Sequence, residues 1–167
     1  MSEILHPDTS DVAGVSVTCS SLPDTMRLGD ALASALKVSD LLCISGPLGA
    51  GKSELCRAII RKCAGDPGLE VPSPSYTLVN VYDRLDVHIW HADLYRIADE
   101  SELHEIGLED AIADSILLVE WPERWTQLPA RRLEVQITLQ PADGRLFSFS
   151  FHGPNWDAVT ATLKACR

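Results

Sequence analysis

The chain has 167 residues and a mass of 18.3 kDa, which is the size of one ordinary domain. Hydrophobic residues make up 46% of it and charged residues 23%, a balance that excludes disordered and collagen-like chains. The formal net charge of −10 argues against strong direct binding of nucleic acid, because such binding depends on Lys and Arg side chains that neutralise phosphates.

Strands and helices are expected to alternate along the first half of the chain. The alternating run Val15–Cys19 predicts a strand, and the apolar run Asp40–Ser45 predicts a short buried one. Helical spacing of apolar residues predicts a helix over Asp24–Lys37, capped by Asp24, and a second helix over Lys52–Ala64. The following segment is rich in Pro and Gly up to Pro74 and is expected to be a loop.

Two more strands and a short helix are expected next. Tyr76–Tyr82 and Val87–Ala92 are both typical of strands and are separated by a polar turn. Asp99 and Glu102 have the spacing of a capping box, which predicts a short helix that ends near Gly107.

The last third of the chain adds a buried strand, a hairpin and a helix. Ser115–Glu120 is continuously apolar before its final acid, which predicts a strand buried on both faces. Arg132–Gln140 and Leu146–Phe151 alternate, and Asp143-Gly144 between them is a strong hairpin signal. Asn155–Ala165 is expected to be a helix. The order of elements predicts an α/β fold with a mostly parallel sheet and an antiparallel C-terminal hairpin.

The same composition favours one cytoplasmic domain over residues 1–167, with residues 1–12 flexible. The longest aliphatic runs have four residues, as in Ile116–Val119, so no segment is expected to span a membrane. The five cysteines include no C-x-x-C pair, which argues against a disulfide framework or a zinc knuckle. Cys43 and Cys56 are therefore expected to be small apolar core residues.

The segment Gly46–Ser53, GPLGAGKS, matches the phosphate-binding pattern G-x-x-x-x-G-K-[ST] in full. Its glycines allow backbone N–H groups to turn inward around phosphate oxygens, and the helix that begins at Lys52 directs its positive end at the same anion. The Lys52 ammonium can reach the β and γ phosphates, and the Ser53 hydroxyl can bind Mg²⁺. An apolar strand precedes the pattern and a helix follows it, so the segment predicts a site for a nucleoside triphosphate.

A magnesium ion in such a site also needs a carboxylate at the end of a neighbouring strand. Two acids qualify. Glu120 ends the apolar run that begins at Ile116, and Asp93 ends the run that begins at Val87. Each is either a capping or ion-paired residue or part of the site. If both serve the site, one on the metal and one on the attacking water, the sequence leaves open which does which.

The loop Ser73-Pro74-Ser75-Tyr76 offers hydroxyl groups just before a strand. It is either a surface turn bounded by Pro74 or a switch-like segment that places Ser75 near the γ-phosphate or the metal.

The negative charge is concentrated in one stretch. Residues 83–124 hold 12 acids and 3 bases, and residues 99–114 hold seven acids and neither Lys nor Arg. This stretch is either a solvated acidic helix face or a docking surface for a basic protein partner.

Four motifs in this order resemble the TsaE family, the small bacterial P-loop ATPases required for threonylcarbamoyladenosine modification of tRNA. They are GPLGAGKS, SPSYTLVN, HADLYR at residues 91–96 and VEWPE at residues 119–123. The resemblance extends from the T-x-x-L-G pattern at Thr25–Gly29 to the Asp143-Gly144-Arg145 hairpin. The chain departs from the family at Ser75, where the family's S-P-T motif has a stiffer threonine.

The resemblance implies a three-layer P-loop NTPase-like fold with a reduced sheet, weak ATPase activity alone, and action on a complex of TsaD-like and TsaB-like proteins. It implies ATP and Mg²⁺ as cofactors, with Ser53 and Glu120 on the metal and Lys52, Asp93 and Glu120 in hydrolysis. The residues it places at the nucleotide are Leu22, Thr25, Leu48, Gly49, Ala50, Gly51, Lys52, Ser53, Glu54, Ser75, Trp121 and Gly144.

Three other functions share the phosphate-binding motif. A small-molecule kinase needs a cationic lid, and residues 83–124 supply few bases for one. A GTPase needs an N-K-x-D segment to recognise guanine, and the sequence contains none. A nucleotide-gated binding module, in which ATP orders the loop around Ser75 and hydrolysis is incidental, remains an alternative.

Overall fold

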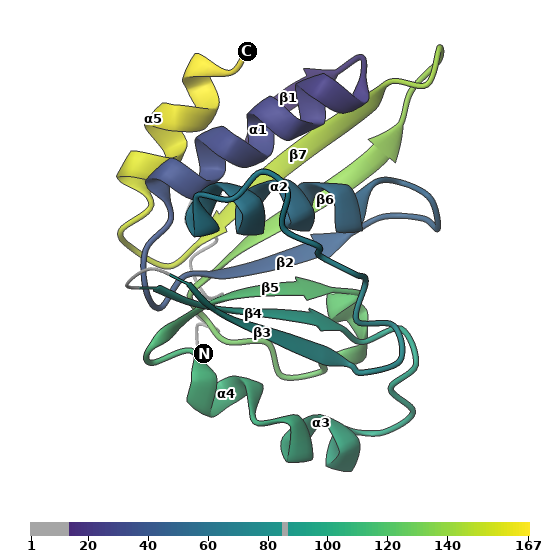
Figure 1. Cartoon of the computed structure of the whole chain (residues 1–167), viewed down its shortest axis with the longest axis vertical. Helices are drawn as coiled ribbons and strands as arrows, with labels where there is room; N and C mark the ends of the chain where they lie inside the picture. The colour runs from purple at the N-terminus through teal and green to yellow at the C-terminus, as the bar shows by residue number, and fades with distance from the viewer. Residues whose placement is uncertain (1–13, 85–86) are drawn as a thin grey trace, which may run out of the picture.

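The computed structural model describes residues 14–84 and 87–167 (Figure 1). The segment expected to be flexible, residues 1–12, therefore lies outside the described residues. The strands are β1 (Val15–Cys19), β2 (Leu41–Ser45), β3 (Val79–Arg84), β4 (Val87–Asp93), β5 (Ser115–Glu120), β6 (Arg132–Leu139) and β7 (Arg145–His152). The helices are α1 (Leu22–Ala35), α2 (Lys52–Ala64), α3 (Glu100–Ile106), α4 (Leu108–Ala111), α5 (Asp157–Ala165) and the 3₁₀ turn η1 (Pro122–Arg124).

All the strands join one mixed sheet in the order β1-β7-β6-β2-β5-β4-β3. The central strands β6, β2, β5 and β4 pair in parallel, while β1 with β7, β6 with β7 and β3 with β4 pair antiparallel. This confirms the predicted α/β fold with a parallel core and a C-terminal hairpin. The edge strand β3 is also antiparallel to its neighbour, because the chain turns back after β3 and forms β4 beside it.

The sheet is covered on both faces, so the fold has three layers (Figure 1). Successive residues of a strand point to opposite faces, and the core divides accordingly. On β2, Leu42 and Ile44 pack with α1, α2 and α5, whereas Leu41 and Cys43 pack with α3, α4 and η1. Each face buries an apolar layer, which explains why the central strands are apolar on both sides.

Three elements begin two or more residues away from the predicted start, and α1 also ends at Ala35, two residues before the predicted Lys37. Helix α1 is capped by Ser21 rather than Asp24: the Ser21 hydroxyl accepts from the Asp24 N–H, and the Asp24 carboxylate accepts from the Ser20 N–H. Strand β3 begins at Val79 rather than Tyr76, because Leu78 has φ 66° and its N–H closes a turn on the Pro74 carbonyl.

The third boundary is the start of α5, which lies at Asp157. The sequence predicted a start at Asn155, but that residue has φ 67° and belongs to the preceding turn. The helices over 52–64 and 100–106 and the strands over 15–19 and 115–120 match their predictions within a residue.

Candidate functional site

The phosphate-binding motif forms the loop between β2 and α2, at the carboxyl edge of the parallel strands. Two of its glycines are required by the backbone. Gly51, the residue before α2, has φ 101°, and Gly46 has φ 155° with the Ile137 carbonyl oxygen 3.0 Å from where a Cβ would lie. The loop therefore runs directly into the positive end of a 13-residue helix, as the motif predicts.

A pocket of about 360 Å³ opens in front of this loop. Its lining joins five chain segments: the loop and first turn of α2, the Ser73–Ser75 loop, the end of β4, the end of β5 and Trp121. The lining residues are Leu48, Gly49, Ala50, Gly51, Lys52, Ser53, Glu54, Ser73, Ser75, Asp93, Glu120 and Trp121. Most residues that the sequence predicts at the nucleotide thus lie around one pocket.

The two candidate carboxylates are neighbours at the edge of the sheet. Asp93 and Glu120 are register partners on the parallel strands β4 and β5, and both side chains are buried. Each meets a hydroxyl group: Ser53 Oγ donates to Glu120 Oε2 at 3.1 Å, and Ser75 Oγ donates to Asp93 Oδ2 at 3.4 Å. A serine hydroxyl beside a carboxylate is the hard oxygen donor set that Mg²⁺ prefers, so these residues fit that ion.

The Lys52 side chain is folded back onto the loop. Its ammonium donates to the carbonyl oxygens of Gly46 at 2.7 Å and Pro47 at 2.8 Å, and it lies 4.2 Å from the centre of the Trp121 ring. Burial lowers the pKa of this ammonium, although the nearby Glu120 and Asp93 carboxylates act in the opposite direction. The Lys52 ammonium is thus held at the phosphate-binding loop by two carbonyl acceptors.

Comparison with known proteins assigns the chain to a family. The sequence model of the family described as "Threonylcarbamoyl adenosine biosynthesis protein TsaE" matches residues 19–147. The chain belongs to the TsaE family. The matched segment contains every element that lines the pocket, and it ends within β7.

Curated relatives within the TsaE family extend the match. The chain is 32% identical over 139 residues to the tRNA threonylcarbamoyladenosine biosynthesis protein TsaE of Rickettsia prowazekii, covering 83% of this chain and 95% of that protein. It is 37% identical over 126 residues to the protein of that name from Rickettsia conorii, covering 75% and 71%. In structure it resembles YdiB of Bacillus subtilis with a TM-score of 0.78, at 23% identity and over 94% of this chain and 98% of the other. That last likeness shows the fold.

Three residues predicted from the TsaE resemblance do not line the pocket. Leu22 is half exposed and borders a separate groove between α1 and α2, of about 550 Å³, which meets the pocket at Glu54. Thr25 is buried on the inner side of α1. Gly144 lies in the turn between β6 and β7. None of these three residues lines the pocket at the phosphate-binding loop.

Two residues that the sequence analysis did not assign to the site contact it directly. His91 Nε2 lies 2.7 Å from Glu120 Oε1, and both side chains are buried. Cys56, one turn along α2 from Ser53, lies against the same carboxylate, and burial, reinforced by Glu120, raises the pKa of its thiol well above the usual value. The predicted burial of Cys56 is confirmed, but the residue is also a neighbour of the site. The alternation of His91 with Asp93 along β4 was the available signal for the histidine.

Arg145 is a further contact that the sequence analysis missed. Its guanidinium donates to the carbonyl oxygens of Ala50 at 2.9 Å and Gly49 at 3.4 Å. The hairpin between β6 and β7 is thereby fastened to the phosphate-binding loop, which accounts for the position of Gly144 beside it.

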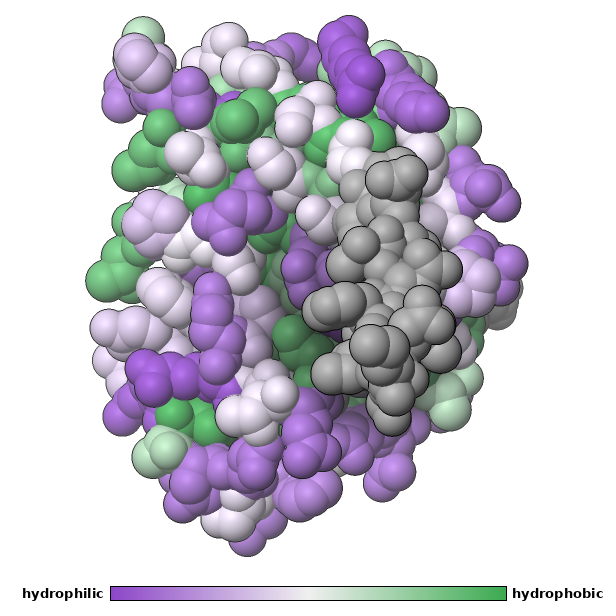
Figure 2. Space-filling view, turned by 180° about the vertical axis from the view of Figure 1, so that it is seen from behind, coloured by the Kyte–Doolittle hydropathy of each residue, from purple (hydrophilic) through white to green (hydrophobic). Residues whose placement is uncertain are grey.

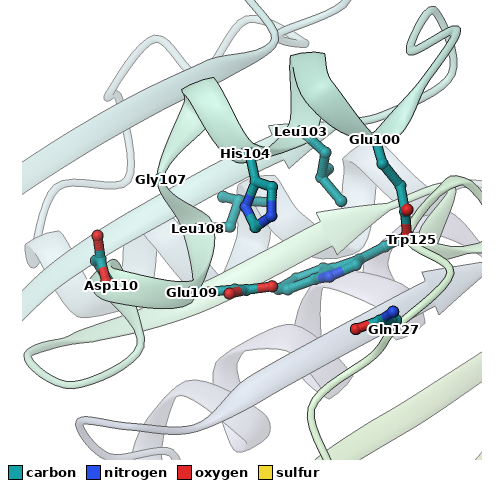
Figure 3. Close-up of a pocket in the computed structure, with 9 residues that line it drawn as sticks. All are labelled: Glu100, Leu103, His104, Gly107, Leu108, Glu109, Asp110, Trp125 and Gln127. Atoms are coloured by element: carbon teal, nitrogen blue, oxygen red, sulfur yellow. The ribbon is translucent and has the colours of Figure 1, made fainter.

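A second, smaller hollow of about 110 Å³ lies away from the phosphate-binding loop, on α3, α4 and the segment after η1 (Figure 3). Figure 3 shows the Trp125 ring at its floor, with Glu100, Glu109 and Asp110 around it. At this end of the molecule the surface is mostly hydrophilic (Figure 2).

Among the helices of the described residues, none has the length and apolar character that a membrane span requires.

Proposed function

We propose that this chain binds ATP with Mg²⁺ in the pocket at the phosphate-binding loop and hydrolyses it during threonylcarbamoyladenosine modification of tRNA. The observation that carries the proposal is the meeting of Ser53 and Glu120, at 3.1 Å, in front of a complete phosphate-binding loop. The names of the relatives support the pathway. The choice of adenine as the base rests on the family resemblance.

In this proposal the loop and Lys52 hold the triphosphate. Backbone N–H groups from Gly49 to Ser53 donate to phosphate oxygens, and the start of α2 adds its positive partial charge. The Lys52 ammonium leaves the carbonyl oxygens of Gly46 and Pro47 and binds the β and γ phosphates. Two acceptors are exchanged for others of greater charge, so the move is favourable.

The hydroxyl of Ser53 and the Glu120 carboxylate hold the metal in this arrangement. Mg²⁺ held by these two groups would supply positive charge that stabilises the charge developing on the phosphate oxygens. Asp93 lies beside Glu120 with Ser75 on its outer oxygen, and it acts on the water. The water oxygen bonds to the γ-phosphorus, the bond to the β–γ bridging oxygen breaks, and Asp93 accepts the proton released.

The matching experiment is titration calorimetry of the full chain with ATP in the presence and absence of Mg²⁺, followed by measurement of phosphate release. Binding that Mg²⁺ strengthens, with slow turnover that a TsaD-like and TsaB-like complex accelerates, is the expected result. Absence of nucleotide binding by the folded protein would overturn the proposal.

We propose that the partner is a complex of TsaD-like and TsaB-like proteins, and that the acidic end of the molecule contributes to docking. The surface consists of Glu100, Glu102 and Glu105 on α3 with Glu109 and Asp110 on α4. It lies on the face of the sheet opposite α1 and α2. A basic partner surface would complement this charge, while a phosphate backbone would be repelled by it.

One observation favours the nucleotide-gated module as a second candidate. Ser75 contacts Asp93 at 3.4 Å, while its neighbour Tyr76 is 87% exposed and faces solvent beside Arg96. Nucleotide binding at Asp93 can therefore order an exposed segment without any hydrolysis. The Glu120→Gln variant separates the two candidates, as set out in the Discussion.

A kinase is less well supported. Of the described residues that line the pocket, Lys52 alone carries a positive charge, so the pocket lacks the cationic lid that phosphoryl transfer to a second substrate requires.

A further inference from the structure

The Glu120 carboxylate is buried at the end of β5, where its two oxygens meet different donors and the Cys56 thiol is a further neighbour. Oε2 accepts from Ser53 Oγ at 3.1 Å, on the side of the pocket. Oε1 lies 2.7 Å from His91 Nε2, on the inner side. Both His91 and Glu120 are at most 2% exposed, so water does not compete for this contact.

We infer that His91 is a positioning residue: its Nε2–H fixes the rotation of the Glu120 carboxylate, so that Oε2 faces Ser53 and the metal. The inference rests on the proposed function, since it concerns how tightly the chain holds Mg²⁺. It assigns to His91 a role in the site without any contact to nucleotide or metal.

The strand register explains how the histidine reaches this oxygen. Asp93 pairs with Glu120 across β4 and β5, and His91 pairs with Leu118, one step back on the same face of the sheet. The imidazole therefore lies diagonally across the strand pair from Glu120, on the side away from the pocket. From there its Nε2 reaches Glu120 Oε1. Asp93 takes the position in front, next to the pocket.

The surroundings of Nδ1, the other ring nitrogen of His91, indicate that the residue acts through Nε2. An ionised carboxylate only accepts, so a neutral ring that donates to it carries its proton on Nε2 and has none on Nδ1. Nδ1 is buried and has no hydrogen-bond partner among the described residues. An unpartnered polar atom in the core costs stability that an apolar side chain would avoid. A histidine at this position is therefore explained by what Nε2 does.

Cys56, His91 and Glu120 could also be read as a site for a thiophilic metal, but the distances fit a hydrogen bond better. Their ligand atoms lie within 4.8 Å of one another, as such a site would require. However, His91 Nε2 and Glu120 Oε1 are 2.7 Å apart, whereas ligands bonded to tetrahedral zinc at about 2.0–2.1 Å are separated by roughly 3.3 Å. The pair has the spacing of a hydrogen bond.

The test compares substitutions that differ in reach. The amide nitrogen of His91→Gln can replace Nε2, while His91→Asn is equally polar but too short, and His91→Phe keeps a ring without a donor. His88→Gln, on the exposed part of the same strand, is the matched control. Each full-length variant is titrated with ATP in EDTA and then at increasing Mg²⁺, with circular dichroism to establish folding.

We expect the substitutions at His91 to change the affinity for Mg²⁺ but not the metal-free affinity for ATP. Affinity for ATP in EDTA stays within about twofold of the unsubstituted protein in all variants. The Mg²⁺ concentration that half-saturates the complex rises about tenfold in His91→Asn and His91→Phe, in line with the usual effect of removing a partner of a metal ligand. His91→Gln and His88→Gln keep the original value. If His91→Phe does not fold, the Asn and Gln pair still decides.

An unchanged Mg²⁺ requirement in His91→Asn would overturn the inference, and so would an equal loss of metal-free ATP affinity in both amide variants. Failure of the unsubstituted protein to bind ATP with Mg²⁺ would instead overturn the proposed function. The two failures are therefore distinguishable.

Discussion

Asp93 and Glu120 occupy paired positions on adjacent parallel strands, and each accepts a hydrogen bond from a different serine. The Glu120 serine comes from the first turn of α2, and the Asp93 serine comes from the loop before β3. The two neighbouring carboxylates thus differ in the chain segment that supplies their hydrogen-bond donor. In the proposed function, this division corresponds to holding a metal at Glu120 and acting on a water molecule at Asp93.

Replacement of Lys52 by alanine is expected to weaken ATP binding about tenfold to a hundredfold. The change removes hydrogen bonds from a cation to phosphate, which are worth about 1.5–3 kcal/mol. Titration calorimetry measures the affinity directly. Lys62→Ala, on the exposed face at the other end of α2, is the control and should bind normally. Equal affinity in the two variants would argue against this pocket as the nucleotide site.

The Glu120→Gln variant is expected to keep metal-free ATP binding, to need more Mg²⁺ for saturation, and to lose about 100-fold or more of the turnover. The amide preserves the size of the buried side chain but removes the negative charge from the metal. Phosphate release gives the rate, and the content of modified tRNA in cells gives the function. If modification survives without turnover, the nucleotide-gated module is the better description.

Reversing the charge of Glu100, Glu102 and Glu105 to lysine is expected to slow association with the TsaD-like and TsaB-like complex about tenfold at low salt. These side chains lie on one short helix on the face of the sheet opposite α2, and none of them lines the pocket, so intrinsic ATPase activity should change little. Surface plasmon resonance at two salt concentrations measures the association rate.

The control for this charge reversal places the same three lysines at acids outside the surface. Suitable positions are Asp30, Glu70 and Asp157. A loss of association in both triple variants would reveal a general effect of net charge, and a loss in neither would remove the docking role of α3.

The thiol of Cys43 gives a prediction about stability. Burial raises its pKa from the usual 9.0 to about 12. The folded state therefore keeps a proton that the unfolded state loses above pH 9.0, so this contribution to stability is complete below that pH and is lost as the pH rises towards 12. The free energy of unfolding should fall by up to about 1.4 kcal/mol per pH unit in that window.

Urea denaturation at pH 7, 9 and 10 tests this dependence. Cys43→Ala is expected to be less stable at pH 7, because a buried group is removed from β2, but to lose less stability on going to pH 10. A parallel decline in the variant and the unsubstituted protein would show that other groups are responsible.

The sequence predicts well what depends on neighbouring residues. The phosphate-binding loop and α2 are encoded in one continuous segment, and β5 is recognisable because its apolar run has no interruption. The start of α1 was misplaced since Ser21 and Asp24 cap it together, and either residue alone can serve as a cap.

Contacts between distant segments were harder to predict. His91 meets Glu120 only because β4 and β5 pair in one register, and the spacing of 29 residues along the chain carries no information about that pairing. Arg145 reaches Ala50 for a similar reason, through the position of the hairpin beside β2. Cys56 was predicted to be buried, but its neighbour across the core could not be read from the helix alone.

The resting position of Lys52 has a consequence for selectivity in the cell. Since two carbonyl oxygens already satisfy the ammonium, a ligand must offer more than they do to draw it outward. Free orthophosphate, an abundant competitor, is a poor match for that demand, whereas a chain of phosphates meets the lysine and the loop at once. Under the proposed function, a single small anion would therefore compete weakly with a triphosphate for this loop.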